Sequence, residues 1–227
     1  METAKRLFFD RGYDGTSIQD ILDAMGLSKG GFYHHFESKQ AVLSEICEQQ
    51  ISQSLQKTFQ ELSRSRAAGL AKLSALIRKV DLFEREDVPF AAIMLKVCYL
   101  DGDPVIRQRV REVTTRQLLP YVEEAITEAL AASEIFVRRR GRMAEMILCL
   151  CEDINDMICA SAREQLEQPE HVLDVLEIAD NGEEFLETVL CAPAGTLRLV
   201  DVEVFVRKYR QTCLVLAEMA RRGRIQG

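Results

Sequence analysis

Apolar residues near the start of the chain recur at helical spacing. Four of them occupy positions i, i+3, i+4 and i+7 and so form one helical face: Ile18, Ile21, Leu22 and Met25. Ser17 directly precedes this face and is a good residue to cap the start of a helix. Gly26 follows it, and glycine readily adopts the left-handed conformation with which helices end. The pattern therefore predicts a short amphipathic helix between Ser17 and Gly26.

A second short helix follows almost at once. We expect Leu27 to be the buried residue of the turn and Ser28 to cap the next helix. The core side of that helix carries Phe32 and Phe36, and Ser38 caps the helix after it. Two helices joined by a tight turn that contains glycine are typical of a helix-turn-helix, in which the second helix enters the major groove of DNA.

Helical patterns continue to the end of the chain, and no strand alternation or repeat is visible. Pro120 predicts a kink or a break in its helix, and Asn181-Gly182 predicts an interruption of an irregular acidic segment. All-α is the predicted fold class. The predicted helices span about 3–12, 38–62, 70–83, 90–97, 104–131, 138–167 and 202–219, with the irregular segment at 169–194.

The N-terminal residues resemble the DNA-binding domain of TetR-type repressors over residues 3–47. The resemblance rests on Phe8, Gly12-Tyr13, Gly15-Thr16-Ser17, Asp20-Ile21, Gly26, Ser28-Lys29-Gly30, Phe32-Tyr33, His35-Phe36 and Ser38-Lys39. It implies a three-helix DNA-binding head at 1–47 and a larger helical body at 48–227 that binds an effector and dimerises. It also implies a sequence-specific transcriptional regulator, a ligand-responsive repressor that acts as a homodimer on an inverted-repeat operator in double-stranded DNA.

Candidate DNA contacts lie on the two helices of the motif. Lys29, Gly30 and Gly31 open the second helix, where base contacts are usually made. Two glycines weaken a helix by about 1 kcal/mol each relative to alanine, which indicates that close approach to DNA matters more there. By resemblance, Tyr33, Lys39 and Ser17 contact phosphates. The remaining candidates are Gln19 for a base edge, Ser28, and either His34 or His35, of which we expect His34 to face outward.

The resemblance also implies a small-molecule pocket in the body, among the helices at about 66–160, for an effector that the sequence does not identify. Methionines and aromatic residues suit adaptable pockets, although each alone is more often ordinary core. The candidate lining residues are Phe90, Met94, Tyr99, Tyr121, Met143, Met146, Asn155 and Met157. The arginine run 138–142 is either an anion site or solvated surface. The helices near 138–167 and 201–221 are the candidate dimer interface.

Composition and charge limit the classes of protein to which the chain can belong. The chain has 227 residues, 47% hydrophobic and 29% charged, with a net charge of −7. Residues 1–45 carry five basic and seven acidic side chains, so the head should bind bulk DNA weakly and be sensitive to salt. No apolar run is long enough for a membrane span, and the first residues read as an amphipathic helix. We therefore expect a cytoplasmic protein without a membrane partner.

Seven cysteines are scattered along helical patterns without metal-finger spacing, and most are expected to be small buried hydrophobic residues. Cys149 and Cys151 are the best candidates for a redox pair, although positions i and i+2 face different sides of a helix. No cofactor or metal is predicted. Catalysis is not expected, because the chain has no glycine-rich phosphate loop and His171 is the only histidine outside the head.

The sequence also allows one alternative to a ligand-responsive repressor. The protein could be a DNA-binding interaction protein that is controlled by a protein partner and has no small-molecule effector. A sizeable buried cavity in the body would favour the ligand-responsive repressor. A packed body with an exposed apolar patch would favour control by a partner.

Overall fold

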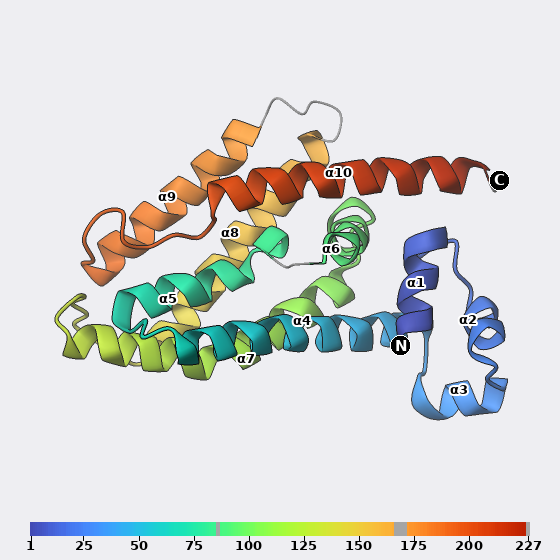
Figure 1. Cartoon of the computed structure of the whole chain (residues 1–227), viewed down its shortest axis with the longest axis horizontal. Helices are drawn as coiled ribbons and strands as arrows, with labels where there is room; N and C mark the ends of the chain where they lie inside the picture. Colours follow the sequence, from blue (N-terminus) through green and yellow to red (C-terminus); the bar gives the residue numbers. More distant parts are fainter. Residues whose placement is uncertain (85–86, 166–171, 226–227) are drawn as a thin grey trace.

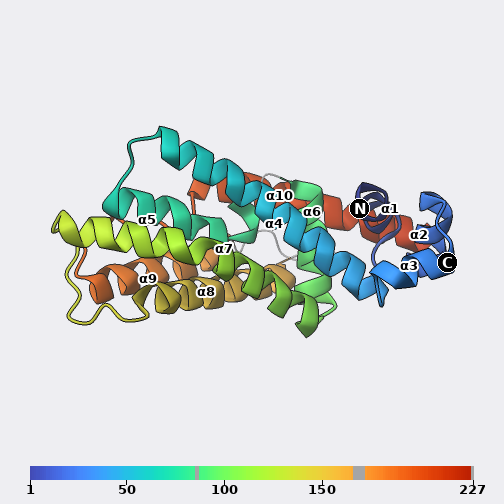
Figure 2. The same cartoon turned by 90° about the horizontal axis from the view of Figure 1, so that it is seen from below.

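The computed structural model describes residues 1–84, 87–165 and 172–225, and His171 lies outside the described residues. Within those ranges the chain forms ten α-helices, two 3₁₀ segments and one π turn, with no β-strand. The all-α prediction is confirmed. A small head of three helices lies at one end of a longer helical body, as Figures 1 and 2 show.

The head consists of α1 (Glu2–Arg11), α2 (Ile18–Met25) and α3 (Lys29–His35). Helix α4 (Lys39–Arg64) begins in the head and continues without interruption into the body. Its apolar face is buried along most of its length, from Val42 to Leu55. The predicted boundary at residue 47 therefore falls inside a continuous helix, and a shift of this helix moves the head and the body together.

The body is built from pairs of packed helices. Its elements are α5 (Gly69–Ile77), η1 (Arg78–Val80), η2 (Leu82–Glu84), α6 (Val88–Leu95), the π turn η3 (Lys96–Leu100), α7 (Pro104–Ala131), α8 (Met143–Gln165), α9 (Val172–Leu190) and α10 (Val202–Ile225). Helix α7 packs against α4, α5 and α8, whereas α8 and α9 form a hairpin. Helix α10 crosses α6 and η2 and also contacts α1.

The interruption predicted at Asn181-Gly182 is wrong. Helix α7 does not break at Pro120, whereas a kink there stays a prediction. Helix α9 is continuous through Asn181-Gly182, because Gly182 packs in the core and does not break the helix. A Cβ atom at Gly182 would lie 2.5 Å from Cδ1 of Ile154 and 2.9 Å from Cδ1 of Leu199. The glycine thus allows α9 to pack closely on α8 and on the segment before α10.

Two predicted helices are shorter than expected. The helix predicted at 138–167 begins at Met143, because Arg142 has a φ of 60°, which a right-handed helix does not accommodate; residues 166–167 lie outside the described ranges. The helix predicted through Phe83 ends at Ile77 and continues as the 3₁₀ segments η1 and η2. The four described arginines at 138, 139, 140 and 142 therefore lie in an exposed loop.

The prediction for the cysteines holds for four of the seven. Cys47, Cys98, Cys151 and Cys159 are buried and Cys213 is partly buried, whereas Cys149 and Cys191 are exposed. Burial raises the pKa of the Cys151 thiol, which keeps it protonated at neutral pH. Cys149 faces solvent while Cys151 lies in the core, as the helical geometry of positions i and i+2 requires.

Candidate DNA-binding site

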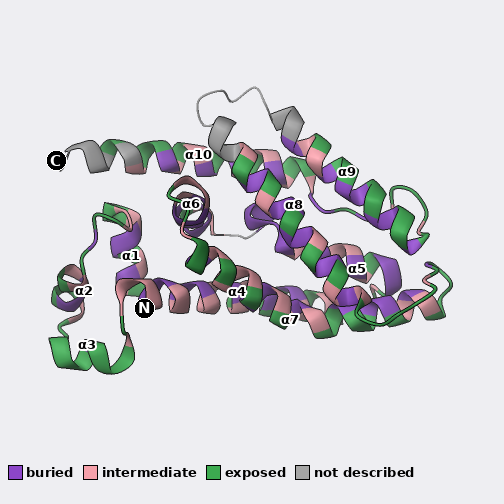
Figure 3. Cartoon of the chain, turned by 180° about the vertical axis from the view of Figure 1, so that it is seen from behind, coloured by how far each residue is buried: buried purple, intermediate pink, exposed green. Residues whose placement is uncertain are grey.

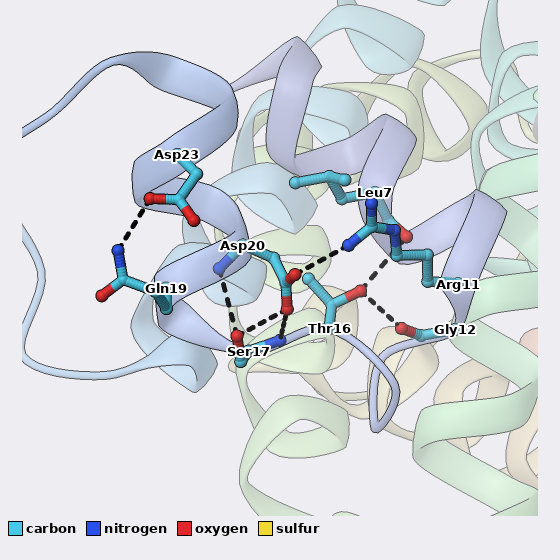
Figure 4. A network of polar contacts seen from close by, with 8 residues as sticks. All are labelled: Leu7, Arg11, Gly12, Thr16, Ser17, Gln19, Asp20 and Asp23. Carbon is cyan, nitrogen blue, oxygen red and sulfur yellow. Dashed lines mark hydrogen bonds and ion pairs between the residues drawn. The ribbon is translucent and has the colours of Figure 1, made fainter. Parts of the chain in front are cut away.

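The first helix of the motif is fixed by its own caps. The Oγ atom of Ser17 accepts a hydrogen bond from the backbone N–H of Asp20 at 3.1 Å, and the carboxylate of Asp20 accepts one from the backbone N–H of Ser17 at 2.8 Å. This reciprocal capping box is visible in Figure 4. The hydroxyl group and the backbone N–H of Ser17 both donate to the Asp20 carboxylate, and these two bonds lower the pKa of that group. At its other end, Gly26 adopts the left-handed conformation with a φ of 64°, as predicted.

Thr16 holds the loop between α1 and α2, a role that the sequence analysis missed. Its hydroxyl group is buried and lies 2.8 Å from the carbonyl oxygen of Gly12 and 3.2 Å from that of Leu7. Arg11 adds an ion pair to Asp20 at 2.7 Å. A threonine directly before a helix cap could have signalled this role, because its hydroxyl can satisfy the last carbonyls of the preceding helix.

The turn between α2 and α3 differs from the prediction in one respect. Leu27 is 43% exposed and not buried. Its backbone N–H donates to the carbonyl oxygen of Leu22 at 3.0 Å, so the main chain of the turn is satisfied. The head core beneath the turn is already filled by Ile21, Leu22 and Phe32, which are 1–2% exposed. The Leu27 side chain consequently remains at the surface.

Helix α3 opens with a capped and unusually bare first turn. Ser28 accepts a hydrogen bond from the backbone N–H of Gly31 at 3.1 Å. At Gly30, apart from the chain neighbours and the helix backbone, no atom of the described residues lies within 4 Å of where a Cβ atom would be. At Gly31, the nearest such atom is Oγ of Ser28, at 3.3 Å. Internal packing therefore does not explain Gly30, and its bare backbone is available to an external surface.

The candidate contact residues of the motif lie on an accessible part of the head. Helix α3 occupies the outer edge of the head, away from the body (Figures 1 and 2). Tyr33 is 49% exposed, and its ring meets the buried Phe32 ring edge-on, with the two ring centres 5.4 Å apart. The other exposed candidates are Ser17, Gln19, Ser28, Lys29, Gly30, Gly31 and His34. His35 is exposed as well, so burial does not distinguish the two histidines.

Besides the two cap residues Ser17 and Ser28, two further candidates form hydrogen bonds within the head. The amide of Gln19 donates to Asp23 at 2.7 Å, on the exposed surface of α2. The ammonium group of Lys39 donates to the carbonyl oxygen of Tyr13 at 2.7 Å and lies 4.2 Å from the centre of the Tyr13 ring. Burial lowers the pKa of Lys39, and the charge of Asp14 partly opposes that effect. Lys39 thus joins the start of α4 to the loop after α1, and its contact with phosphate stays a prediction.

Three of the predicted effector-pocket residues meet in the body. Met94, Tyr99 and Asn155 line a cavity of about 10 Å³, which has room for about one water molecule. The hydroxyl of Tyr99 donates to Asp156 at 2.6 Å, and Arg111 donates to the same carboxylate at 2.8 Å. This polar cluster connects the π turn η3, α7 and α8.

The other five predicted pocket residues lie elsewhere. Phe90 is buried in the core at the start of α6, and Tyr121 stacks on Phe59 at 3.6 Å. Met143 and Met146 line a separate groove, and Met157 is 51% exposed on α8. The eight residues therefore do not form a single pocket.

The groove that contains Met143 and Met146 runs between α8 and α9 and is mostly apolar. Its volume is about 330 Å³, and its further lining includes Phe185 and Val189. Met146 is 63% exposed and Phe185 is 56% exposed. Figure 3 shows these two helices on one face of the body with exposed residues along them. An apolar face of this kind typically meets another protein surface.

Two negative findings apply to the described residues. None of their helices combines the length and the hydrophobicity that a bilayer crossing would need. Among the same residues, histidine, cysteine and acidic side chains form no cluster of three that could hold a metal ion.

Comparison with known proteins agrees with the geometry of the head. Residues 1–46 match the family described as bacterial regulatory proteins, tetR family. The chain is 27% identical over 128 residues to the HTH-type transcriptional repressor KstR2 of Rhodococcus jostii (strain RHA1), covering 56% of each chain. It is 36% identical over 129 residues to the HTH-type transcriptional repressor DhaR of Mycobacterium sp. (strain GP1), covering 55% of this chain and 58% of that one.

These matches span little more than half the length of the two curated relatives. Among solved structures, Salmonella enterica GusR is similar with a TM-score of 0.49 and 21% identity, over 84% of this chain and 93% of that one. Both repressors are named as regulators and not as enzymes. Residues 1–46 therefore form a head of the kind found in the tetR family of bacterial regulatory proteins, and the chain resembles two repressors over about half of their length.

Proposed function

We propose that the protein is a sequence-specific transcriptional repressor that binds an inverted-repeat operator as a homodimer in the cytoplasm. The observation that carries this proposal is the first turn of α3. It is capped by Ser28 and exposed, and it carries at Gly30 a glycine that no described neighbour requires. A bare, capped helix start of this kind suits close approach to base edges in the major groove.

The charge of the head favours specific over non-specific binding. Acidic side chains outnumber basic ones within residues 1–45, so few phosphates can be neutralised by this part of the chain. Affinity then depends on a small number of placed groups, including Lys29 and the hydroxyl of Tyr33, and on backbone N–H groups at helix starts. A dimer is needed as well, because one head reads only a short half-site.

The homodimer interface proposed here is formed by α8 and α9. The pattern of the sequence alone favours α8 together with the last helix. However, α10 already uses its apolar face within the chain, where Phe205 and Tyr209 meet the ring of Phe83 at 5.1 and 5.5 Å. The apolar side chains Met146 and Phe185 on α8 and α9 remain exposed. Pairing these faces in two copies would build a four-helix interface.

An effector would act through the polar cluster around the small cavity. The cavity of about 10 Å³ is far below the several hundred Å³ of a preformed ligand site, so binding would require it to expand. Met94 lines it and is flexible enough to move. An effector that stabilises the expanded body would weaken DNA binding, and DNA would weaken effector binding by the same factor.

Control by a protein partner is the second candidate, and the small cavity favours it. The cavity inside the body is small, and the apolar groove between α8 and α9 would in this case hold the partner in place of a second copy of the chain. A body of this kind satisfies the criterion for a partner-controlled regulator. The two candidates differ in their prediction for a screen of small molecules: only an effector raises the melting temperature of the isolated protein.

The experiment that tests the common part of the proposal is selection of binding sites from random duplex DNA at two salt concentrations. We expect an inverted repeat to be enriched at both salt concentrations, and the fraction of all DNA that is bound to be higher at low salt. No enriched site at either salt concentration would contradict the proposed function.

A further inference from the structure

Helix α6 is bonded to the DNA-binding head near both of its ends. Asp87, the cap at its start, forms an ion pair with Lys5 on α1. Lys96 directly follows its last residue and forms an ion pair with Asp14, in the loop between α1 and α2, at 3.2 Å. One contact holds α1 and the other holds the loop after it. Together they restrict the rotation of the head about α4.

The contact at the start of α6 is well enclosed. The Lys5 side chain is only 17% exposed and also donates to Gln50 of α4 at 2.8 Å. Its ammonium group lies 5.9 Å from the centre of the Phe90 ring. Asp87 accepts a further hydrogen bond from the backbone N–H of Phe90 at 3.1 Å. Lys5 therefore joins α1, α4 and α6 at a single point.

The contact at the end of α6 belongs to the π turn η3. Burial disfavours the charge of Lys96, but Asp101 and Asp14 outweigh that effect and raise its pKa, so the ion pair persists at neutral pH. The same turn carries Tyr99, which is bonded to Asp156 of α8. A π turn is often found at functional sites. Here it connects the head on one side with the polar cluster of the body on the other.

Ion pairs near the surface contribute little to folding stability, but they restrict the orientation of the head relative to the body. In a dimer, both heads must fit the same duplex at once. Half-sites lie about one helical turn apart, ~34 Å. The distance between the two recognition helices depends on the orientation of both heads, so a restraint on each head acts on that distance twice. A modest restraint can therefore determine which half-site spacing is bound.

We propose that the two ion pairs of α6 set the half-site spacing that the protein selects. Lys5 and Lys96 are positioning residues in this proposal, because they orient the head and do not themselves touch DNA. The inference rests on the proposed function, operator binding by a dimer. It adds the specific contacts through which the body fixes the orientation of each head.

The test measures affinity for a series of operators that differ only in the spacer between the half-sites. The variants are Lys5→Met, Lys96→Met and the double variant, which keep most of each side chain and remove its charge. Asp14→Asn breaks the second ion pair from the head side, where Asp14 is 72% exposed and folding is not at risk. Arg6→Met is the matched control, since it removes one positive charge from the exposed surface of α1.

We expect the preference for the best spacer over spacers two base pairs longer or shorter to fall roughly tenfold in the double variant. Binding to a single half-site should change by less than about twofold, and Arg6→Met should keep the wild-type spacer profile. Unchanged spacer profiles in the double variant and in Asp14→Asn would overturn the inference. If the wild-type protein selects no operator at all, the proposed function itself fails, which is a distinguishable result.

Discussion

Glu187 on α9 accepts a hydrogen bond from the backbone N–H of Leu197 at 2.8 Å, in the segment that leads to α10. The same carboxylate accepts one from Gly195 at 2.9 Å. One turn earlier, Glu183 accepts from the backbone N–H of Leu199 at 2.8 Å. Two buried carboxylates thus satisfy the main chain of a segment that forms no helix of its own.

Replacing Glu187 by glutamine should destabilise the fold. Glutamine keeps one acceptor oxygen but places an NH₂ group against a backbone N–H, so one buried donor loses its partner. We expect the free energy of unfolding to fall by roughly 1–3 kcal/mol in urea denaturation. Glu184→Gln is the control, because Glu184 is exposed on the same helix. Equal midpoints for both variants would contradict the role of Glu187.

Glu187 should also contribute to the acid sensitivity of the protein. Burial raises the pKa of Glu187, but hydrogen bonds from the backbone N–H groups of Leu197, Gly195 and Thr196 lower it by more. The net pKa is therefore below the ordinary value. Its stabilisation is therefore complete above the unfolded pKa of about 4.3 and is lost as the pH falls through the lower folded value. The stability of wild type should drop more steeply than that of Glu187→Gln below about pH 4.3. Parallel pH curves would refute this assignment.

Gly182 and Gly30 should respond in opposite ways to alanine. At Gly182 the new methyl group would overlap Ile154 and Leu199, and overpacking costs about 1–3 kcal/mol, which exceeds the gain of at most about 1 kcal/mol from replacing a helical glycine. At Gly30 only that gain applies. We expect thermal melting to show destabilisation by Gly182→Ala and slight stabilisation by Gly30→Ala. Stabilisation by both would mean that α9 does not pack closely on α8.

The dimer interface can be located with two charged substitutions. Phe185→Glu places a charge in the groove between α8 and α9, whereas Leu214→Glu does so on α10, where Leu214 is 70% exposed. Sedimentation should show a monomer for Phe185→Glu and a dimer for Leu214→Glu, because a buried unpaired charge opposes association. The reverse result would move the interface to α10.

Lys29 and Tyr33 should affect DNA binding differently. Lys29→Ala should lower affinity and also relax the base preference at one position of the selected site. Tyr33→Phe should lower affinity about fivefold for all sequences, because it removes a hydrogen bond to phosphate. Tyr121→Phe, in the body, is the control for the loss of a hydroxyl group. Unchanged affinity for Tyr33→Phe would contradict the proposed docking of α3.

The head could be predicted from the sequence because its structure is specified locally. Ser17, Gly26 and Ser28 act on residues three or four positions away, and the structure confirms all three caps. The course of α9 could not be predicted in the same way. Gly182 reads as a helix breaker until its neighbours are known, and those neighbours are distant in sequence. Local propensity loses to tertiary packing at such a position.

The same limit explains why the predicted pocket residues are scattered and why we propose a dimer interface other than the one that the sequence indicates. Helical periodicity indicates which residues share a face but not which other helix covers that face. Tyr99 and Asn155 meet at the cavity, whereas Met146 on α8 faces outward. Likewise, the apolar face of α10 packs against Phe83 of η2, which lies more than a hundred residues away in the sequence. Only the assembled fold distinguishes an internal face from an exposed one.

The central claim is that the bare start of α3 approaches DNA closely, and Gly30→Val tests it most directly. Beyond its chain neighbours and the helix backbone, no described atom lies within 4 Å of a Cβ atom at Gly30, so the melting temperature should stay close to that of wild type. The dissociation constant for the selected operator should rise by roughly 10- to 100-fold, because the added methyl groups fill the space that the bases need. A folded Gly30→Val protein that binds the operator as tightly as wild type would contradict the account.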